Sequence, residues 1–197
     1  MKKPSLLSLI AAFACVALYA QTPDYRFGKV SAQELRMTSY DKDPDAAAVY
    51  LYEENSLFYQ IDREIGLTSD YRARIKILKS DGTDQANVSI PYTDEYSVRE
   101  SVFGIDAVAY NLVDGKIVKT PLKKQYIFTE QVGENHKLVK FSIPEVREGT
   151  VIEYKFRKTS KNPTYIPSFR FQHDIPVARC HMQALIPEFF KIGRASC

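Results

Sequence analysis

The adjacent residues Cys180 and His181 are the pair in this sequence whose types most resemble a catalytic nucleophile and its base. A thiol acts as a nucleophile when a histidine within hydrogen-bond reach accepts its proton. The surrounding residues predict a strand, in which neighbouring side chains face opposite ways, so the two cannot form such a dyad with each other. Cys180 could instead meet His136 or His173 in space. We interpret Cys180 as a small buried thiol on a core strand and keep a thiol enzyme as the alternative.

The sequence patterns that bind metals and cofactors are incomplete or missing. The three histidines have no close spacing and give no metal-binding signature. Asp41, Asp43 and Asp45 resemble the opening of a calcium loop. Pro44 and the missing glycine and distal glutamate break that pattern, which therefore predicts a solvated turn. The sequence also has no Gly-rich phosphate loop, no GxSxG elbow and no HExxH motif. We predict no catalytic, cofactor-binding or metal-binding residue in this chain.

The N-terminus has the layout of a secretory signal peptide. Lys2 and Lys3 precede the apolar run Leu6–Tyr19, and Ala20 then precedes a polar sequence. This order of charge, apolar run and small residue predicts a signal peptide over residues 1–20. The run is shorter than the about 20 residues of a comfortable membrane span, so we expect no spanning segment after cleavage. We expect an exported protein that is periplasmic, outer-surface or secreted.

A lipoprotein is the alternative reading of this N-terminus. It would need a lipid-accepting cysteine, and Cys15 is available. Bulky Phe13 two residues before it, and the apolar run that continues behind it, argue against lipidation. We therefore expect cleavage after Ala20 and a mature protein that begins at Gln21.

The C-terminal residues 192–197, IGRASC, follow Pro187–Phe190 without a structural pattern. The same residues result from translating the start of a common sequencing adapter in the frame ATC-GGA-AGA-GCG-TCG-TGT. That frame requires the preceding codon to end in AG, which Lys191 satisfies. We expect that this end is adapter-derived and that the natural protein continues past residue 191; a short natural tail is the alternative.

The charge balance depends on these two ends. The full chain has 27 basic and 24 acidic side chains, and without Lys2, Lys3 and Arg194 the two signs are equal in number. A balanced chain lacks the basic footprint of a nucleic-acid-binding or anionic-membrane-binding protein. Cys180 is then the one cysteine left, so an internal disulfide cannot form and stability must come from the core.

The segment Phe141–Ser160 gives the clearest strand signal. After the reversal predicted at Glu148-Gly149, its residues alternate between apolar and charged. This period of two is typical of a strand with one buried and one solvated face. The predicted inward residues are Ile152, Tyr154 and Phe156, and the predicted solvated residues are Glu153, Lys155 and Arg157.

The rest of the chain predicts one short helix and further strands. Ser31 and Glu34 have capping-box spacing, so a short helix is expected there, ending before the turn at 41–45. Hairpins are predicted for 47–53 with 57–63, 71–79 with 85–92 around Asp81-Gly82, 104–112 with 116–120 around Asp114-Gly115, and 126–129 with 136–143. About ten short strands favour a mainly β fold, an antiparallel two-sheet β-sandwich with one short N-terminal helix. We expect a helix and lead-in over 21–46 and a sandwich domain over 47–190.

Several segments together resemble a known family. In chain order they read YRARIKILKSDG, AVAYNLVDGKIVK, KFSIPEVREGTVIEYKFRKTS and SFRFQHDIPVARCHMQALIPEFF. The set, over roughly residues 50–190, resembles domain-of-unknown-function family 3857, found in exported proteins of Bacteroides-type bacteria ahead of a transglutaminase-like domain. The resemblance implies a β-sandwich and a partner domain with no established activity. A Cys-His-Asp triad of the transglutaminase-like kind would belong to sequence beyond residue 191, so no catalytic residue is carried onto this chain.

Three functions remain open at this point. The leading one is a non-catalytic exported module, the N-terminal part of a larger transglutaminase-like protein, which supports or presents substrate to a downstream transglutaminase-like or peptidase-like domain of the same chain. The second is a surface module that binds a glycan or peptide on exposed tyrosines. The third is an enzyme that uses the Cys180 thiol. A flat apolar patch near the C-terminal end would favour the first, and a cluster of tyrosines on one solvated face the second. The expected partners are the downstream domain and an extracytoplasmic protein or glycan, not nucleic acid.

Overall fold

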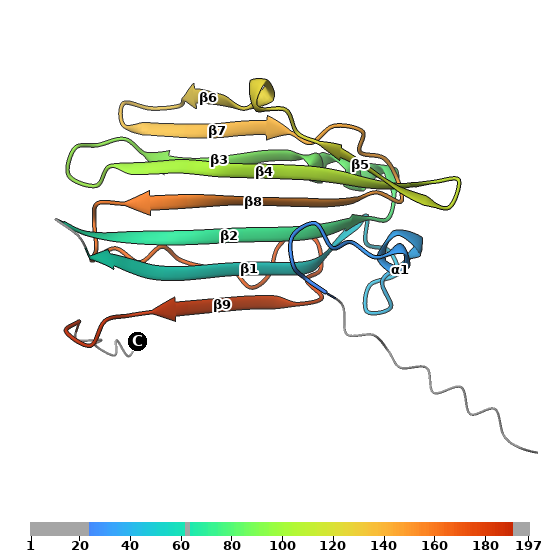
Figure 1. Ribbon diagram of the computed structural model, residues 1–197, viewed down its shortest axis with the longest axis horizontal. Coiled ribbons are helices and arrows are strands. Elements are labelled where there is room, and N and C mark those ends of the chain that lie inside the picture. The colour runs from blue at the N-terminus through green and yellow to red at the C-terminus, as the bar shows by residue number, and fades with distance from the viewer. Residues whose placement is uncertain (1–23, 62–63, 191–197) are drawn as a thin grey trace, which may run out of the picture.

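The computed structural model describes residues 24–61 and 64–190, which form two β-sheets and one short α-helix (Figure 1). The predicted signal peptide at 1–20 and the predicted adapter-derived tail at 192–197 lie outside these residues. The large sheet has six strands in the order β5 (Lys116–Pro121), β4 (Glu100–Val113), β8 (Val151–Ser160), β2 (Ile65–Ile77), β1 (Ala48–Ile61) and β9 (Cys180–Leu185). The small sheet has three strands in the order β3 (Asn87–Thr93), β7 (His136–Ser142) and β6 (Phe128–Gln131).

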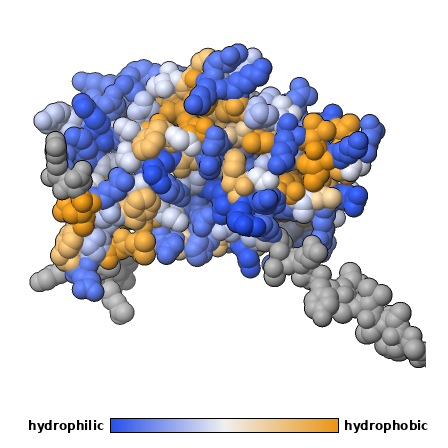
Figure 2. Space-filling model, viewed as in Figure 1, coloured by the Kyte–Doolittle hydropathy of each residue, from blue (hydrophilic) through white to orange (hydrophobic). Residues whose placement is uncertain are grey.

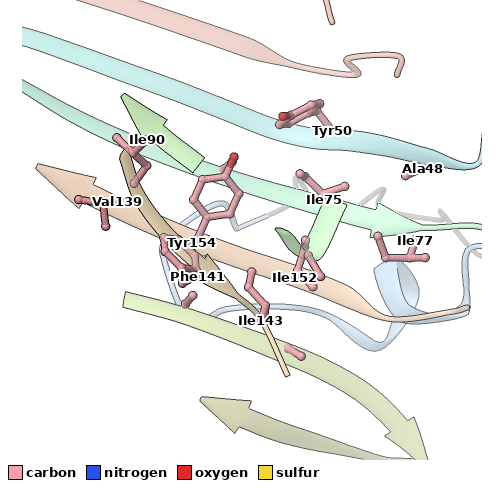
Figure 3. Close-up of a cluster of buried hydrophobic side chains, with 14 residues drawn as sticks. Ala48, Tyr50, Ile75, Ile77, Ile90, Val139, Phe141, Ile143, Ile152 and Tyr154 are labelled. Carbon is pink, nitrogen blue, oxygen red and sulfur yellow. The ribbon is translucent and has the colours of Figure 1, made fainter. Parts of the chain in front are cut away.

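The two sheets share one apolar core, which confirms the predicted β-sandwich. Ile152 and Tyr154 of β8 face Ile90 of β3 and Phe141 of β7 in this core (Figure 3). The rings of Phe141 and Tyr154 meet edge to face with centroids 6.3 Å apart. Each fully buried side chain of this size contributes about 1.5–3 kcal/mol to the free energy of folding. Because Cys180, the cysteine within the described residues, is free, the core supplies the stability of this part of the chain.

The helix α1 (Ala32–Arg36) lies at one end of the large sheet, against the face opposite the small sheet (Figure 1). Its capping box is formed as predicted: Ser31 Oγ accepts from Glu34 N at 3.2 Å, and the Glu34 carboxylate accepts from Ser31 N at 2.6 Å. Leu35 is buried against Val49 and Tyr110 of the sheet. One end of the large sheet is therefore covered on both faces. Within the described ranges no helix is long and apolar enough to cross a membrane.

The hairpin predicted for 47–53 and 57–63 is wrong, because β1 is one continuous strand that pairs with β2 along its length. The polar triplet at 54–56 does not turn the chain. Glu54 pairs with Arg72 at 2.6 Å, and Asn55 Oδ1 accepts from Ser69 Oγ at 2.6 Å. These cross-strand partners satisfy polar groups that would otherwise favour a turn.

The hairpin predicted around Asp81-Gly82 is also wrong. Residues Ser80–Ala86 form a 3₁₀ helix, η1, and the following strand β3 pairs with β7 of the small sheet. Gly82 serves close packing instead of a turn, because a Cβ atom there would lie 2.3 Å from the carbonyl oxygen of Ala47. The chain thus crosses from one sheet to the other at this point.

The segment 141–160 also crosses between sheets, because its two runs become β7 and β8. Gly149 has the positive φ, 87°, that the predicted reversal requires. Ile152 and Tyr154 are buried as expected. Glu153, predicted to face solvent, is 1% exposed, because the N-terminal segment and α1 cover that face of β8. The predicted hairpins β4–β5, around Asp114-Gly115, and β6–β7 are confirmed.

Strand β9 joins the sheet beside β1 in the parallel direction, with Cys180 opposite Glu53. The residues that carry the chain from β8 to β9, 161–179, are called the strap below. The strap is tied to β1 by backbone hydrogen bonds from Tyr50 N to Pro176 O, 2.9 Å, and from Ala178 N to Tyr50 O, 2.8 Å. Figure 1 shows this connection running along β1 and β2 before β9 begins.

Candidate functional site

The carboxylate of Glu53 brings together residues from β1, β2, the strap and β9. Tyr71 donates its hydroxyl to Oε1 at 2.6 Å. Nε2 of His173 lies 2.9 Å from Oε2, and the thiol of Cys180 donates to the same oxygen at 3.7 Å. Glu53 is 1% exposed, whereas the His173 side chain is 25% exposed. This Glu53 cluster is therefore a buried acid under a partly open histidine.

The arrangement makes Cys180 a poor nucleophile. Burial and the negative charge of Glu53 raise the pKa of the thiol from 9.0 to about 11. A reactive cysteine needs the opposite, a positive neighbour that lowers the pKa. His173 contacts the carboxylate of Glu53, and the structure gives no hydrogen bond between His173 and Cys180 within the described residues.

Aromatic rings enclose the Glu53 cluster on the core side. The His173 ring lies on the Tyr50 ring with centroids 4.7 Å apart. Burial, together with neighbouring tyrosines and Glu53, raises the pKa of Tyr71 far above its ordinary value. Burial likewise raises the pKa of Tyr50 and Tyr154. These hydroxyls remain protonated, so Tyr71 acts as a hydrogen-bond donor to Glu53.

A cavity of about 370 Å³ opens above the Glu53 cluster, between the large sheet, β3 and the strap. The apolar lining comes from Leu67, Phe156, Ile90, Pro91, Tyr165, Pro167 and Phe169. The polar lining comes from Glu53, Asn55, Ser69, Tyr71, Glu100, Lys158, Thr159, Ser160, Ser168, Arg170 and His173. A mostly apolar wall with a few converging polar groups is typical of a ligand site.

A second cavity of about 540 Å³ continues from the first along β3 toward β7. The two cavities share the lining residues Pro91, Glu100, Lys158, Ser160, Tyr165, Pro167 and Ser168. Together they form one depression, called the strap groove below, that runs from Glu53 to His136 and Leu138.

A separate charged network lies on the opposite face of the large sheet. Arg74 Nε donates to Glu153 Oε1 at 2.8 Å and its Nη1 donates to Glu34 Oε1 at 2.7 Å. Glu153 Oε2 also accepts from the Tyr110 hydroxyl at 2.9 Å and from Gly28 N at 2.8 Å. Because each charge has partners from the N-terminal segment or the sheet, this network holds that segment in place.

The predicted site residues are distributed as follows. His181 lies opposite Glu54, on an exposed position of β9, while Cys180 reaches Glu53. His136 lies in the outer part of the strap groove and does not contact Cys180. The aspartates at 41, 43 and 45 lie in a turn, and none of the acid, histidine or cysteine side chains in the described ranges form a metal-binding group of three.

Sequence reasoning missed Glu53, the residue on which this site is built. Tyr50 and Glu53 both face the core, although alternation from Tyr50 would direct Glu53 to the other face. A register shift in β1 between Tyr50 and Tyr52 makes the difference, and such a β-bulge reverses the direction of every later side chain. The sequence signal that could have revealed Glu53 is an acidic residue directly after a run of apolar residues.

An apolar patch lies where β1 and β9 end, and Figure 2 shows hydrophobic residues gathered at this end of the molecule. Ile61, Leu185 and Phe189 are 60%, 59% and 61% exposed. Phe190 packs on Tyr59, with ring centroids 4.7 Å apart, and so holds this segment to β1. The three exposed residues Ile61, Leu185 and Phe189 are called the C-terminal patch below.

Comparison with known proteins places the fold. The sequence matches no curated protein. The structure is similar to a crystal structure from Parabacteroides distasonis ATCC 8503 whose protein is provisionally assigned as a protease, with a TM-score of 0.50 and 15% sequence identity. The similarity covers 68% of this chain but 28% of that one, so this chain spans a little over a quarter of its neighbour's length. At this identity the likeness concerns the fold.

A family described as a domain of unknown function with a solved structure, DUF3857, matches residues 66–193. The match includes β2, β8 and β9, together with the strap that closes the groove. It also agrees with the resemblance read from the sequence motifs. The chain belongs to the DUF3857 family.

Proposed function

We propose that this chain is a non-catalytic β-sandwich module and the N-terminal part of a larger exported protein. In this proposal it supports a downstream transglutaminase-like or peptidase-like domain of the same chain and presents substrate to it. The observation that carries the proposal is the C-terminal patch, which lies where the chain leaves the sandwich.

The composition of the C-terminal patch is that of a surface to which another domain binds. Large apolar side chains that gather on an exposed surface mark sites of contact with another protein or domain. Ile61, Leu185 and Phe189 come from two different segments and are each more than half exposed. A domain that follows residue 190 would begin beside them. The much greater length of the Parabacteroides neighbour supports a larger parent protein.

The chemistry of Cys180 supports a non-catalytic role for this part. Its pKa of about 11 leaves almost all of the thiol protonated near neutral pH. His173, the histidine of the Glu53 cluster, contacts Glu53 in place of the thiol. A thiol nucleophile needs a base within hydrogen-bond reach and a group that orients that base.

The test begins with an independent read of the gene past residue 191, followed by hydrogen–deuterium exchange of the full-length protein and of this chain alone. We expect the amides around Leu185 and Phe189 to exchange more slowly in the full-length protein. The β5 residues Ile117 and Val118 are a matched control, because they are also apolar and exposed but lie at the other edge of the sheet. Their exchange should not change.

Three results would contradict the proposal. A stop codon shortly after residue 191, or equal exchange of the C-terminal patch in both proteins, would remove the downstream domain or its docking. Transamidation or peptide hydrolysis by this chain alone, abolished by Cys180→Ala, would show that the module is itself an enzyme.

A further inference from the structure

We propose that the strap groove binds an extended peptide segment and that its deep end, at Glu53, receives a lysine side chain. The inference rests on the proposed function, because it names what the module presents. It is tested on this chain alone, so its failure can be told apart from failure of the domain-docking proposal.

The deep end is the buried carboxylate of Glu53, whose one partner among the described residues that can carry a positive charge is His173, at 2.9 Å. Tyr71 and Cys180 contact Glu53 as neutral donors, and His173 offsets the charge of Glu53 only when its ring is protonated. Arg72 and Arg74 project from the opposite face of β2, where they pair with Glu54, and with Glu34 and Glu153. Beside a neutral His173 the buried carboxylate has no cation, which is costly, so a bound cation is favoured there.

The two other cationic side chains that line this part of the groove, Lys158 and Arg170, do not pair with Glu53. Lys158 pairs with Glu100 at 2.9 Å and also donates to Pro91 O at 3.0 Å. Arg170 lies on the exposed part of the strap, at the rim. Glu53 is therefore the group that a positive ligand would reach in the buried part of the groove.

The hydrogen bonds of Glu53 favour an ammonium over a guanidinium. A carboxylate offers about four lone-pair positions, two on each oxygen. Oε2 is taken by His173 and Cys180, whereas Oε1 accepts one bond among the described residues, from Tyr71. An arginine fork needs both oxygens, but a lysine ammonium acts as a point charge and needs one.

The walls suit the aliphatic part of a lysine. Leu67 and Phe156 of the sheet and Phe169 of the strap give apolar surface along the way to Glu53. A lysine buries its methylene chain on such surface and places its charge at the polar end. The inner cavity, about 370 Å³, is large enough for one long side chain and part of its backbone.

The outer cavity favours a peptide over a free amino acid as the ligand of the groove. It continues the groove for a further 540 Å³ past Pro91 and Tyr165 to β7. It runs beside β3, which is an edge strand of the small sheet. An extended peptide would fill both cavities, because recognition beside a sheet edge uses backbone contacts along the strand and pockets for single side chains.

The experiment is a calorimetric titration of the purified chain with the peptide Ac-Ala-Val-Lys-Val-Ala-NH₂. The comparison peptides carry norleucine or arginine in place of lysine, and free lysine is a further ligand. We expect the lysine peptide to bind more than tenfold tighter than each of the three, since a hydrogen bond to a charged group contributes on this order.

Glu53→Gln should lower the affinity for the lysine peptide by more than tenfold and leave the norleucine peptide unchanged. Glu54→Gln is the matched control, because it removes a carboxylate from the next residue of β1 on the opposite face, where Glu54 pairs with Arg72. Phe169→Ala, in the strap, is a second variant that weakens binding without touching the buried acid. Thermal unfolding verifies that each variant is folded.

Equal binding of the lysine and norleucine peptides would overturn the proposal, as would an equal loss in Glu53→Gln and Glu54→Gln. Tighter binding of the arginine peptide would overturn the choice of lysine. If no peptide saturates the chain at millimolar concentration, the groove does not bind peptides of this kind.

Discussion

Arg74 and Glu153 face each other across β2 and β8, with Arg74 Nε 2.8 Å from Glu153 Oε1 and both side chains 1% exposed. The pair is buried because the N-terminal segment lies over it and adds Glu34 and the backbone of Gly28. A buried pair of this kind is costly to break, since the remaining charge has no water around it.

We expect Glu153→Gln to lower the free energy of unfolding by about 3–5 kcal/mol, the range for breaking a buried ion pair. The guanidinium of Arg74 would keep Glu34 but lose its fully buried partner. Urea denaturation followed by far-UV circular dichroism measures the change.

Asp70→Asn is the control for this substitution. Asp70 pairs with Arg157 at 2.6 Å, but both side chains are about two-fifths exposed. An exposed pair contributes about 0–1 kcal/mol. Similar losses in the two variants would contradict the distinction between them.

The Cys180 thiol should react slowly with iodoacetamide in the native protein and rapidly after unfolding. Its thiolate forms around pH 11 in the folded state, compared with the ordinary value of 9.0. At pH 8 the thiolate fraction of Cys180 is therefore about a hundredfold lower in the folded protein than in the unfolded protein, because each pKa unit is a factor of ten. Mass spectrometry of timed samples gives both rates.

Glu53→Gln should raise the native alkylation rate, because it removes a negative charge that raises the pKa of Cys180. His181→Asn, an exposed change on β9, should not. Fast alkylation of the unchanged native protein would instead favour the thiol-enzyme alternative.

Gly82→Ala should destabilise the protein through a steric clash. The added Cβ would lie 2.3 Å from the Ala47 carbonyl oxygen, so η1 must move away from β1. We expect a lower melting temperature, with a loss of about 1–3 kcal/mol. Gly133→Ala is the comparison, since its Cβ would meet nothing nearer than 3.5 Å, and an unchanged melting temperature for Gly82→Ala would show that η1 can shift freely.

We predict that the mature protein begins at Gln21 and resides outside the cytoplasm. The basic residues, the apolar run and the small residue Ala20 are in the order that signal peptidase requires. Intact-mass measurement of the exported protein decides the point. An N-terminus at Met1, or a diacylated Cys15, would be incompatible with this prediction.

Local patterns predicted much of the fold correctly. Ser31 and Glu34 cap α1, Asp114-Gly115 turns the β4–β5 hairpin, and the inward residues Ile152 and Tyr154 form the core. Each of these features depends on neighbours within a few positions, so the sequence contains the necessary information in one place.

The candidate site could not be predicted in the same way. Glu53 faces the core because of a β-bulge, and His173 and Cys180 reach it from 120 and 127 residues away. Glu153 looked solvated because nothing in β8 indicates that α1 covers it. Asp81-Gly82 looked like a hairpin because the close approach to Ala47 is a property of the packed sheet.

Strand β9 pairs with β1 in parallel, and we expect this pairing to form after the hairpins of the large sheet. The antiparallel partner of β1 follows it directly, whereas the β9 contact at Cys180 lies 127 residues from Glu53. Closing so long a loop costs more entropy and slows this pairing relative to the hairpins. Until residue 180 has emerged, β1 presents an open edge to which the strands of other chains can add. During synthesis, the edge of β1 therefore stays open until β9 covers it.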